Sequence, residues 1–186
     1  MAYRSGTYIA FDGLGEVEPT KSDFKYYATI RAWTEHKDID FKFVNSHEKT
    51  AAVRDTSLKA TLQARIRERL ANSKNVVVIL SDQTRKSGSM LSYEIEQAVD
   101  KNDLPLICAY TGYSSILNPS DALLRMRWPL ALEARIDNNT AKAIHIPFRK
   151  DPILDAISQF TVHTGALNIP LQFYNEATHR MWGLIS

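Results

Sequence analysis

Apolar and polar positions alternate along the chain in a way that predicts strands separated by helices. Short apolar runs rich in β-branched and aromatic residues are typical of strands. Longer stretches whose apolar residues recur every three or four positions are typical of amphipathic helices. The predicted strands comprise residues 7–11, 40–44, 75–80, 104–110 and 143–147. The predicted helices comprise residues 23–35, 58–70, 90–101, 121–129 and 151–160.

The run 75–80, Asn-Val-Val-Val-Ile-Leu, is the strongest strand of the chain. A continuous β-branched run predicts a strand buried on both faces, as in the centre of a parallel sheet. Repeated alternation of strands with helices therefore predicts a three-layer α/β domain. We expect one such domain over residues 1–160, with an insertion at 111–142, and a C-terminal extension over 161–186. Both additions are apolar enough to pack on the domain.

Composition limits the function classes. A chain of 186 residues with 44% hydrophobic and 24% charged residues is typical of a globular domain. Its 23 basic and 21 acidic residues give a net charge of +2, so no nucleic-acid partner is expected. No apolar stretch reaches the roughly 18 residues of a membrane span. The start of the chain has no signal-peptide core, and Cys108 is the single cysteine, so we expect a cytoplasmic protein.

Several common catalytic motifs are absent from the sequence. It contains no P-loop, no serine-hydrolase elbow and no pair of histidines at helical metal-site spacing. The turn at residues 12–15, Asp-Gly-Leu-Gly, lacks the third glycine of a dinucleotide fingerprint. Glu16 and Glu18 would also repel a pyrophosphate. We therefore expect no bound metal, and we interpret the glycine turn as a surface turn.

In an open parallel sheet, ligands bind beyond the carboxyl ends of the strands. The loops predicted there span residues 11–18, 45–54, 81–90 and 110–118. Glu94 follows the third of these loops, near the start of the next helix. Helical geometry puts it about 85° from the centre of the buried face, at the boundary between core and solvent. Such a glutamate can serve catalysis, but taken alone a glutamate near a helix N-terminus is usually a surface residue that compensates the helix dipole.

Four features together carry a family resemblance: an aromatic-ended first strand, an amphipathic helix after it, a valine-rich strand with a polar loop, and a Tyr-Glu-Ile helix. They are Tyr8-Ile9-Ala10-Phe11, the helix after Asp23, residues 76–80 with Ser81-Asp82-Gln83-Thr84, and Ser92-Tyr93-Glu94-Ile95 followed by residues 102–107. Over about residues 7–110 the chain resembles the bacterial TIR-like family, particularly the TIR proteins of the Thoeris antiphage system. Met90 stands where that family often has tryptophan. The resemblance implies a flavodoxin-like sheet of about five parallel strands with helices on both faces.

The resemblance also implies cleavage of the bond between nicotinamide and ribose in NAD, with Glu94 as the catalytic residue. Breaking this bond develops positive charge on the ribose, which a fixed carboxylate stabilises. NAD is then the substrate, and no separate cofactor is expected. The family further implies self-association and a cyclic ADP-ribose-type product that activates a separate effector.

Further contacts to the substrate are expected at the carboxyl ends of the strands. Phe11 and Asp12 end the first strand and are expected beside the nicotinamide and its ribose. Ser81 and Tyr93 are candidates for contacts with the ribose. Asn45 and Ser46 follow the second predicted strand, in a loop that in TIR proteins takes part in self-assembly or substrate closure.

Three alternatives stay open at the level of sequence. A nucleoside deoxyribosyltransferase-like enzyme also uses a glutamate against an anomeric carbon. A hydrolase would release ADP-ribose instead of a cyclic product. A non-catalytic interaction module would use its surface for self-association, for example through the arginine-rich helix 58–70.

Overall fold

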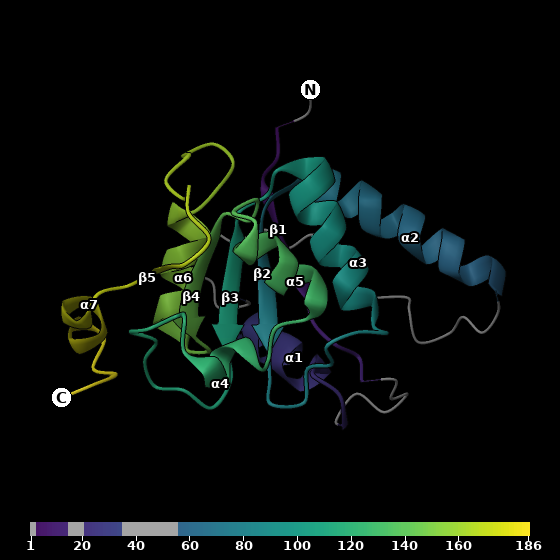
Figure 1. Ribbon diagram of the computed structural model, residues 1–186. Coiled ribbons are helices and arrows are strands. Elements are labelled where there is room, and N and C mark those ends of the chain that lie inside the picture. The colour runs from purple at the N-terminus through teal and green to yellow at the C-terminus, as the bar shows by residue number, and fades with distance from the viewer. Residues whose placement is uncertain (1–2, 15–20, 35–55) are drawn as a thin grey trace.

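In the part of the chain that the structure describes, five parallel strands form a sheet at the centre of the molecule (Figure 1). The computed structural model describes residues 3–14, 21–34 and 56–186. Its strands are β1 (Gly6–Ala10), β2 (Ser73–Leu80), β3 (Leu106–Tyr110), β4 (Ala143–Pro147) and β5 (Gln172–Phe173). They lie side by side in the order of the sequence, and every neighbouring pair is parallel. The predicted strand 40–44 lies outside the described residues.

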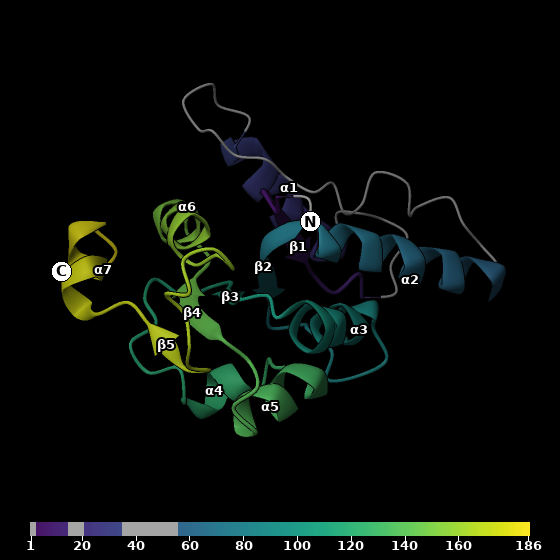
Figure 2. The same ribbon diagram turned by 90° about the horizontal axis from the view of Figure 1, so that it is seen from above.

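Helices cover both faces of this sheet, which confirms the predicted three-layer α/β fold (Figure 2). α1 (Phe24–Thr34) and α6 (Lys150–Gln159) pack on one face. The other face carries α2 (Thr56–Ala71), α3 (Met90–Glu96), α4 (Ala122–Arg125) and α5 (Leu130–Asp137). α3 continues directly into a short π-helical segment, η3 (Gln97–Lys101), and α7 (Glu176–Met181) lies near the C-terminus. No described helix is long and apolar enough to cross a membrane.

From Val76 to Leu80 the interior strand β2 is apolar at every position, without alternation, because both of its faces are buried. Val76, Val78 and Leu80 face the α2–α3–α5 side. Val77 and Ile79 face the α1–α6 side. All five side chains are at most 1% exposed, so each position of the strand gains from burial whichever way it points.

The helix predicted from 121 to about 129 or beyond is interrupted in the structure: α4 ends at Arg125 and a separate helix, α5, begins at Leu130, which corrects that expectation. Asp121 caps α4, because its side chain accepts a hydrogen bond from the N–H of Leu123. The chain then turns, and Pro129 precedes the first residue of α5. Proline has no N–H to continue a helix and is favoured at a helix start, so it separates α4 from α5.

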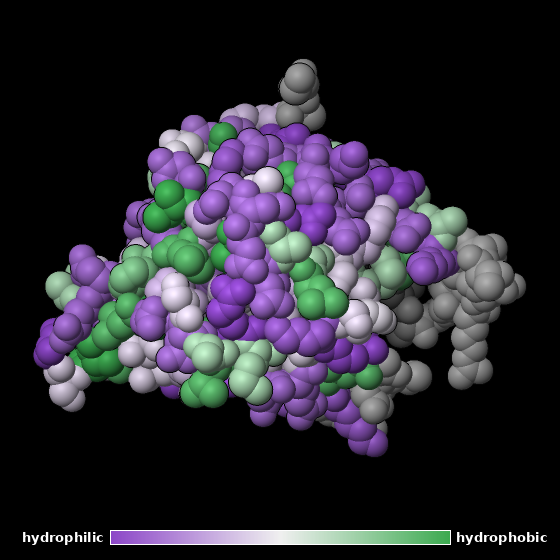
Figure 3. All heavy atoms as spheres, in the orientation of Figure 1, coloured by the Kyte–Doolittle hydropathy of each residue, from purple (hydrophilic) through white to green (hydrophobic). Residues whose placement is uncertain are grey.

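α4 and the beginning of α5 expose apolar side chains. Leu123, Met126 and Leu130 are each more than half exposed. Figure 3 shows hydrophobic residues gathered over α4 on this face of the molecule. Leu124 and Trp128 point the other way, into the core between these helices and the sheet. Leu124 and Trp128 therefore anchor this segment to the core, and the exposed side of α4 and of the start of α5 is apolar.

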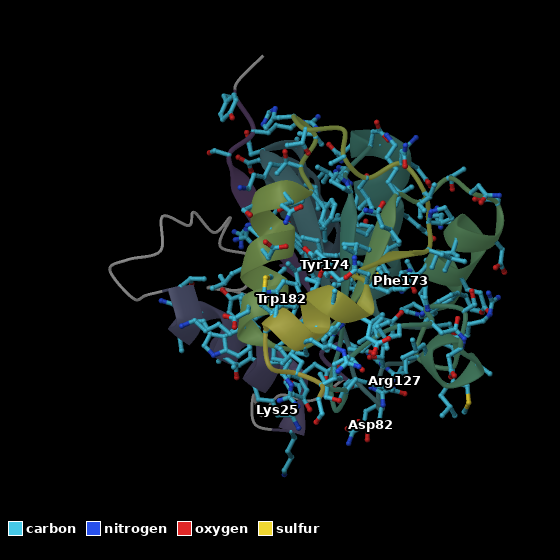
Figure 4. All side chains as sticks on the ribbon, turned by 90° about the vertical axis from the view of Figure 1, so that its left-hand side faces the viewer. Lys25, Asp82, Arg127, Phe173, Tyr174 and Trp182 are labelled. Atoms are coloured by element: carbon cyan, nitrogen blue, oxygen red, sulfur yellow. The ribbon has the colours of Figure 1, made fainter. Side chains whose placement is uncertain are left out.

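The C-terminal extension adds the edge strand β5 to the sheet, pairing Gln172 with Ile144 and Phe173 with His145. Two residues are too few for a strand pattern, so the sequence did not predict it. The Tyr174 hydroxyl donates to Asp155 Oδ2 of α6 at 2.5 Å. Figure 4 shows Tyr174 and Trp182 together beside α7, and their ring centroids are 4.9 Å apart. The division of the chain into domain and extension stays a prediction.

Candidate active site

Glu94 lies on α3, and its side chain is only 3% exposed. It faces the sheet together with Leu91 and Ile95, which are fully buried. The hydroxyl of Tyr8, from the middle of β1, donates a hydrogen bond to Glu94 Oε1 at 2.6 Å. The carboxyl group thus sits between the helix and the sheet, fixed by a residue 86 positions away in the chain.

Glu94 is therefore more buried than its helical position predicted, and the expected place at the boundary between core and solvent is wrong. The prediction used only the apolar positions of the helix itself, whereas α3 and η3 also have helices on their flanks. On one flank, Arg67 of α2 donates to the hydroxyl of Tyr93 at 2.8 Å. On the other, Arg135 of α5 pairs with Asp100. Flanking helices widen the buried sector of α3, so a side chain well off its centre is still covered.

Burial controls the protonation of Glu94. Loss of solvation raises the pKa of this carboxyl from 4.5 to about 8. The hydrogen bond from Tyr8 and the charge of Arg69 oppose the rise in pKa, and the negative charge of Asp12 adds to it. Near neutral pH the carboxyl group therefore holds its proton for most of the time in the substrate-free structure.

One oxygen of Glu94 has no hydrogen-bond partner among the described residues. Oε2 is buried, and no described residue donates to it. The Ser89 Oγ, just before α3, is a second buried atom without a partner among the described residues. Buried polar atoms are normally paired, because an unmade hydrogen bond costs on the order of 1–3 kcal/mol. Oε2 is thus the oxygen of Glu94 that no described residue engages.

Asp12, at the end of β1, forms an ion pair with Arg85. The carboxylate is fully buried, and Arg85 Nη2 lies 2.7 Å from its Oδ1. The backbone N–H groups of Arg85 and Leu14 also donate to it, at 3.0 and 2.8 Å. Burial alone would raise the pKa of Asp12, but the hydrogen bonds from Arg85 and Leu14 outweigh it and lower the pKa. Asp12 therefore carries a fixed negative charge close to Glu94.

Ser81 follows β2 and is bound within the protein. Its hydroxyl donates to Asp23 Oδ2 at 3.0 Å, and its N–H donates to Thr84 Oγ1 at 2.9 Å. Burial raises the pKa of Asp23 to about 6. Ser81 and Asp23 thus join the loop after β2 to the beginning of α1. The proton of the Ser81 hydroxyl is donated to Asp23.

The structure brings some predicted site residues together and separates others. Tyr93 is half-buried and packs against the same core as Glu94. Phe11 packs on the opposite face of the sheet, against Phe24 and Tyr27 of α1. Alternation along β1 is the reason, because neighbouring residues of a strand point to opposite faces. Asn45 and Ser46 lie outside the described residues.

Sequence reasoning missed two residues of this site, Tyr8 and Arg85. Tyr8 carried a usable signal, since a tyrosine within a buried apolar strand needs a partner for its hydroxyl. Alternation places it on the same face as Ala10, toward α3. Arg85 carried no such signal, because its partner Asp12 is 73 positions away and the loop between β2 and α3 is polar throughout.

Further charged side chains stand at the carboxyl edge of the sheet. Figure 4 shows Lys25, Asp82 and Arg127 along this edge, from three different segments of the chain. Arg127 donates to the carbonyl oxygen of Thr111 at 2.7 Å and lies over the ring of Tyr113. In the described parts, no group of three or more His, Cys, Asp or Glu side chains is arranged to hold a metal ion.

The parallel sheet with helices on both faces is the architecture of a TIR-like, flavodoxin-like α/β protein. A family model described as Thoeris protein ThsB, TIR-like domain, matches residues 8–115, which is more than half of the chain. The chain therefore belongs to the ThsB TIR-like family of the Thoeris antiphage defence system. The matched segment contains the last three residues of β1 and all of β2, β3 and α3, and with them Tyr8, Asp12, Arg85 and Glu94.

Proposed function

We propose that this protein cleaves the bond between nicotinamide and ribose in NAD, with Glu94 as the catalytic residue. The observation that carries the proposal is the state of this carboxyl group. It is buried on α3, fixed through one oxygen by Tyr8, and its other oxygen has no partner among the described residues. Membership of the ThsB TIR-like family supports NAD as the substrate.

The chemistry suits a single carboxylate. The bond between C1′ of the ribose and the pyridine nitrogen breaks, and its electron pair leaves with nicotinamide, which becomes neutral. The leaving group therefore needs no general acid. Positive charge develops on the ribose ring, where an ionised Glu94 stabilises it or traps it covalently. The cationic pyridinium of NAD also favours ionisation of Glu94, because a nearby positive charge lowers the pKa of a carboxyl group.

The fate of the ribosyl cation determines the product. We propose that the adenine of the same molecule attacks C1′, giving a cyclic ADP-ribose-type nucleotide that activates a separate effector. Attack by water would give ADP-ribose instead, so cyclisation requires that water is kept from C1′. The C-terminal extension lies at the β5 edge of the sheet, whereas α3 lies toward the β1 edge, so this extension does not cover Glu94 (Figure 1). The N–H of Ile116, in the insertion, donates to His179 Nε2 of α7 at 3.4 Å, joining the two added segments.

The decisive experiment compares Glu94→Gln with Glu96→Gln in phage-infected cells. Glu96 lies two residues further along α3 and is half-buried, so it provides a matched loss of one carboxyl group. Mass spectrometry of the nucleotides should show the cyclic product in wild type and Glu96→Gln. We expect a loss of at least about 100-fold in Glu94→Gln, as for removal of a principal charge-stabilising group.

Infection serves as the trigger in this experiment, because we expect the family's enzymes to need activation. Circular dichroism of the purified variants checks that each remains folded. Equal amounts of product from wild type and Glu94→Gln would contradict the catalytic role of Glu94. An unchanged NAD pool and no new nucleotide in any infected strain would instead favour a non-catalytic interaction module.

A further inference from the structure

Tyr8 occupies an unusual place in the sheet. It lies in the middle of β1, opposite Val76 of β2, and is completely buried. Its neighbours Thr7 and Ile9 point to the opposite face, whereas Tyr8 and Ala10 point toward α3. Phenylalanine would fill this position with the same ring and bury no hydroxyl group. The hydroxyl of Tyr8 is buried and therefore needs a hydrogen-bond partner, which is Glu94 Oε1.

The hydrogen bond from Tyr8 makes the two oxygens of Glu94 different: Oε1 accepts it, and Oε2 does not. The Tyr8 hydroxyl lies 2.6 Å from Oε1, a short distance within the usual range for O–H donors. Oε2 receives no hydrogen bond from any described residue. Rotation of the carboxyl group would break the bond to Tyr8. The group is therefore held in one orientation, in which Oε1 is occupied and Oε2 is available.

The proton of this hydrogen bond stays on Tyr8 throughout the range in which the enzyme would work. Burial raises the pKa of the phenol well above its usual value of 10, and the charge of Glu94 adds to the effect. The hydroxyl is consequently a permanent donor. A donor to a carboxylate stabilises the ionised form, which partly offsets the loss of solvation at Glu94. Asp12, which raises the pKa of Glu94, and Arg69, which lowers it, are the other charged groups that act on it.

We propose that Tyr8 is a positioning residue, which holds Glu94 through Oε1 and presents Oε2 to the C1′ carbon of the ribose. The inference rests on the proposed NAD cleavage and adds to it. Tyr8 does not touch the reacting atoms. It acts by fixing the carboxylate and by favouring its ionised form, and both effects increase the stabilisation of the ribosyl cation.

The test is Tyr8→Phe, with Tyr110→Phe as the matched control. Tyr110 lies on β3, faces the same side of the sheet and is equally buried. Its hydroxyl contacts His145 and Trp128, not Glu94. Both variants therefore lose one buried hydroxyl from the same core cluster, but only Tyr8→Phe removes the donor to Glu94. Purified proteins are assayed for nicotinamide release from NAD across pH 6 to 9.5, with lysate of phage-infected cells as activator.

We expect Tyr8→Phe to lower kcat roughly 10- to 100-fold, the loss of one hydrogen bond to a charged group. Its pH profile should also move to higher pH by about one pH unit, because Glu94 loses a donor that favours ionisation. Tyr110→Phe should keep the wild-type profile. A Tyr8→Phe enzyme with wild-type kcat and an unmoved profile would overturn the proposal. So would a profile that moves equally in both variants, since this would indicate a general loss of packing.

A second measurement separates failure of this inference from failure of the proposed function. Infrared difference spectra between wild type and Glu94→Gln identify the C=O band of protonated Glu94, and its pH dependence gives the pKa without any turnover. We expect a higher pKa in Tyr8→Phe than in wild type, and an unchanged pKa overturns the positioning role even if NAD is cleaved. A shifted pKa in a protein that never cleaves NAD overturns the proposed function, and the role of Tyr8 in catalysis with it.

Discussion

Two buried tyrosines on the same face of the sheet use their hydroxyls in different ways. Tyr8 of β1 donates to Glu94, which keeps one oxygen unpartnered among the described residues. Tyr110 of β3 belongs to a chain of polar groups in which each member has its partner. The indole of Trp128 donates to Tyr110 at 2.6 Å, and the Tyr110 hydroxyl lies 2.7 Å from His145 Nδ1. His145 Nε2 in turn lies 2.9 Å from the carbonyl oxygen of Pro170.

The chemistry of the last partner fixes every proton in the Tyr110 network. A proline carbonyl only accepts, so His145 carries its proton on Nε2 and accepts at Nδ1 from the Tyr110 hydroxyl. This network joins β3 and β4 to the segment before β5. A fully paired network stabilises one packing arrangement. The Tyr8–Glu94 pair leaves an atom unpaired at an energetic cost, which is typical of a functional site.

Among the substitutions in the two regions, removal of the Trp128 side chain should change the stability of the protein most. Trp128 is fully buried, and its indole N–H is the first donor of the Tyr110 network. Trp128→Ala should lower the free energy of unfolding by about 3–5 kcal/mol, because it creates a cavity and leaves a buried hydroxyl short of a donor. Urea denaturation measures the loss. A change below about 1 kcal/mol would contradict a structural role for this network.

Replacing Glu94 should raise the free energy of unfolding, in contrast to the loss expected for Trp128→Ala. Its pKa is about 8 in the folded protein and 4.5 ordinarily. The folded protein therefore retains a proton that the unfolded chain releases, and stability falls as pH rises from 4.5 toward 8. Glu94→Gln removes this dependence and should raise the free energy of unfolding by about 3–4 kcal/mol at pH 7.5, with little change at pH 4.5. Thermal unfolding at both pH values measures it, and equal effects at both would contradict a buried, protonated carboxyl.

The smallest expected effect concerns His145, and its pH dependence runs the other way. Burial lowers the pKa of this imidazole from 6.5 to about 4. The unfolded chain therefore takes up a proton below pH 6.5 that the folded protein refuses, so stability is lost as pH falls from 6.5 toward 4. Between pH 6.5 and 5.5 we expect a loss of about 1 kcal/mol in wild type that is absent in His145→Gln. Parallel pH dependences in the two proteins would contradict a neutral, buried His145.

Much of the fold was predictable because its signals are local. The continuous apolar run of β2 and the repeating apolar positions of α3 and α6 reflect burial that each segment carries in its own residues. The strand predicted to be buried on both faces and the helices on both faces of the sheet are confirmed. Pro129 shows the limit of such reasoning, since the apolar positions around it suggested one helix and the structure has two. β5 was missed because two paired residues leave no periodic pattern.

The sequence predicted one residue of the candidate site, Glu94, but predicted the residues around it less well. Glu94 was placed on the correct helix by its spacing from the strands, and the family resemblance suggested its role. Its degree of burial could not be predicted, because α2 and α5 cover α3 from the sides. The ion pair of Asp12 with Arg85 joins residues 73 positions apart, and no local pattern indicates such a pair.

The sequence by itself determined the order of strands and helices, the burial of the valine-rich strand on both faces and the helix that carries Glu94. Hydrophobic periodicity encodes these features, because it records which side of each segment is buried. Only the tertiary structure decided that Tyr8 meets Glu94, that Phe11 faces the opposite side of the sheet, and that a histidine in β4 stays neutral. The physical reason is that hydrogen bonds and pKa values depend on which atoms become neighbours after packing, and those neighbours come from distant parts of the chain.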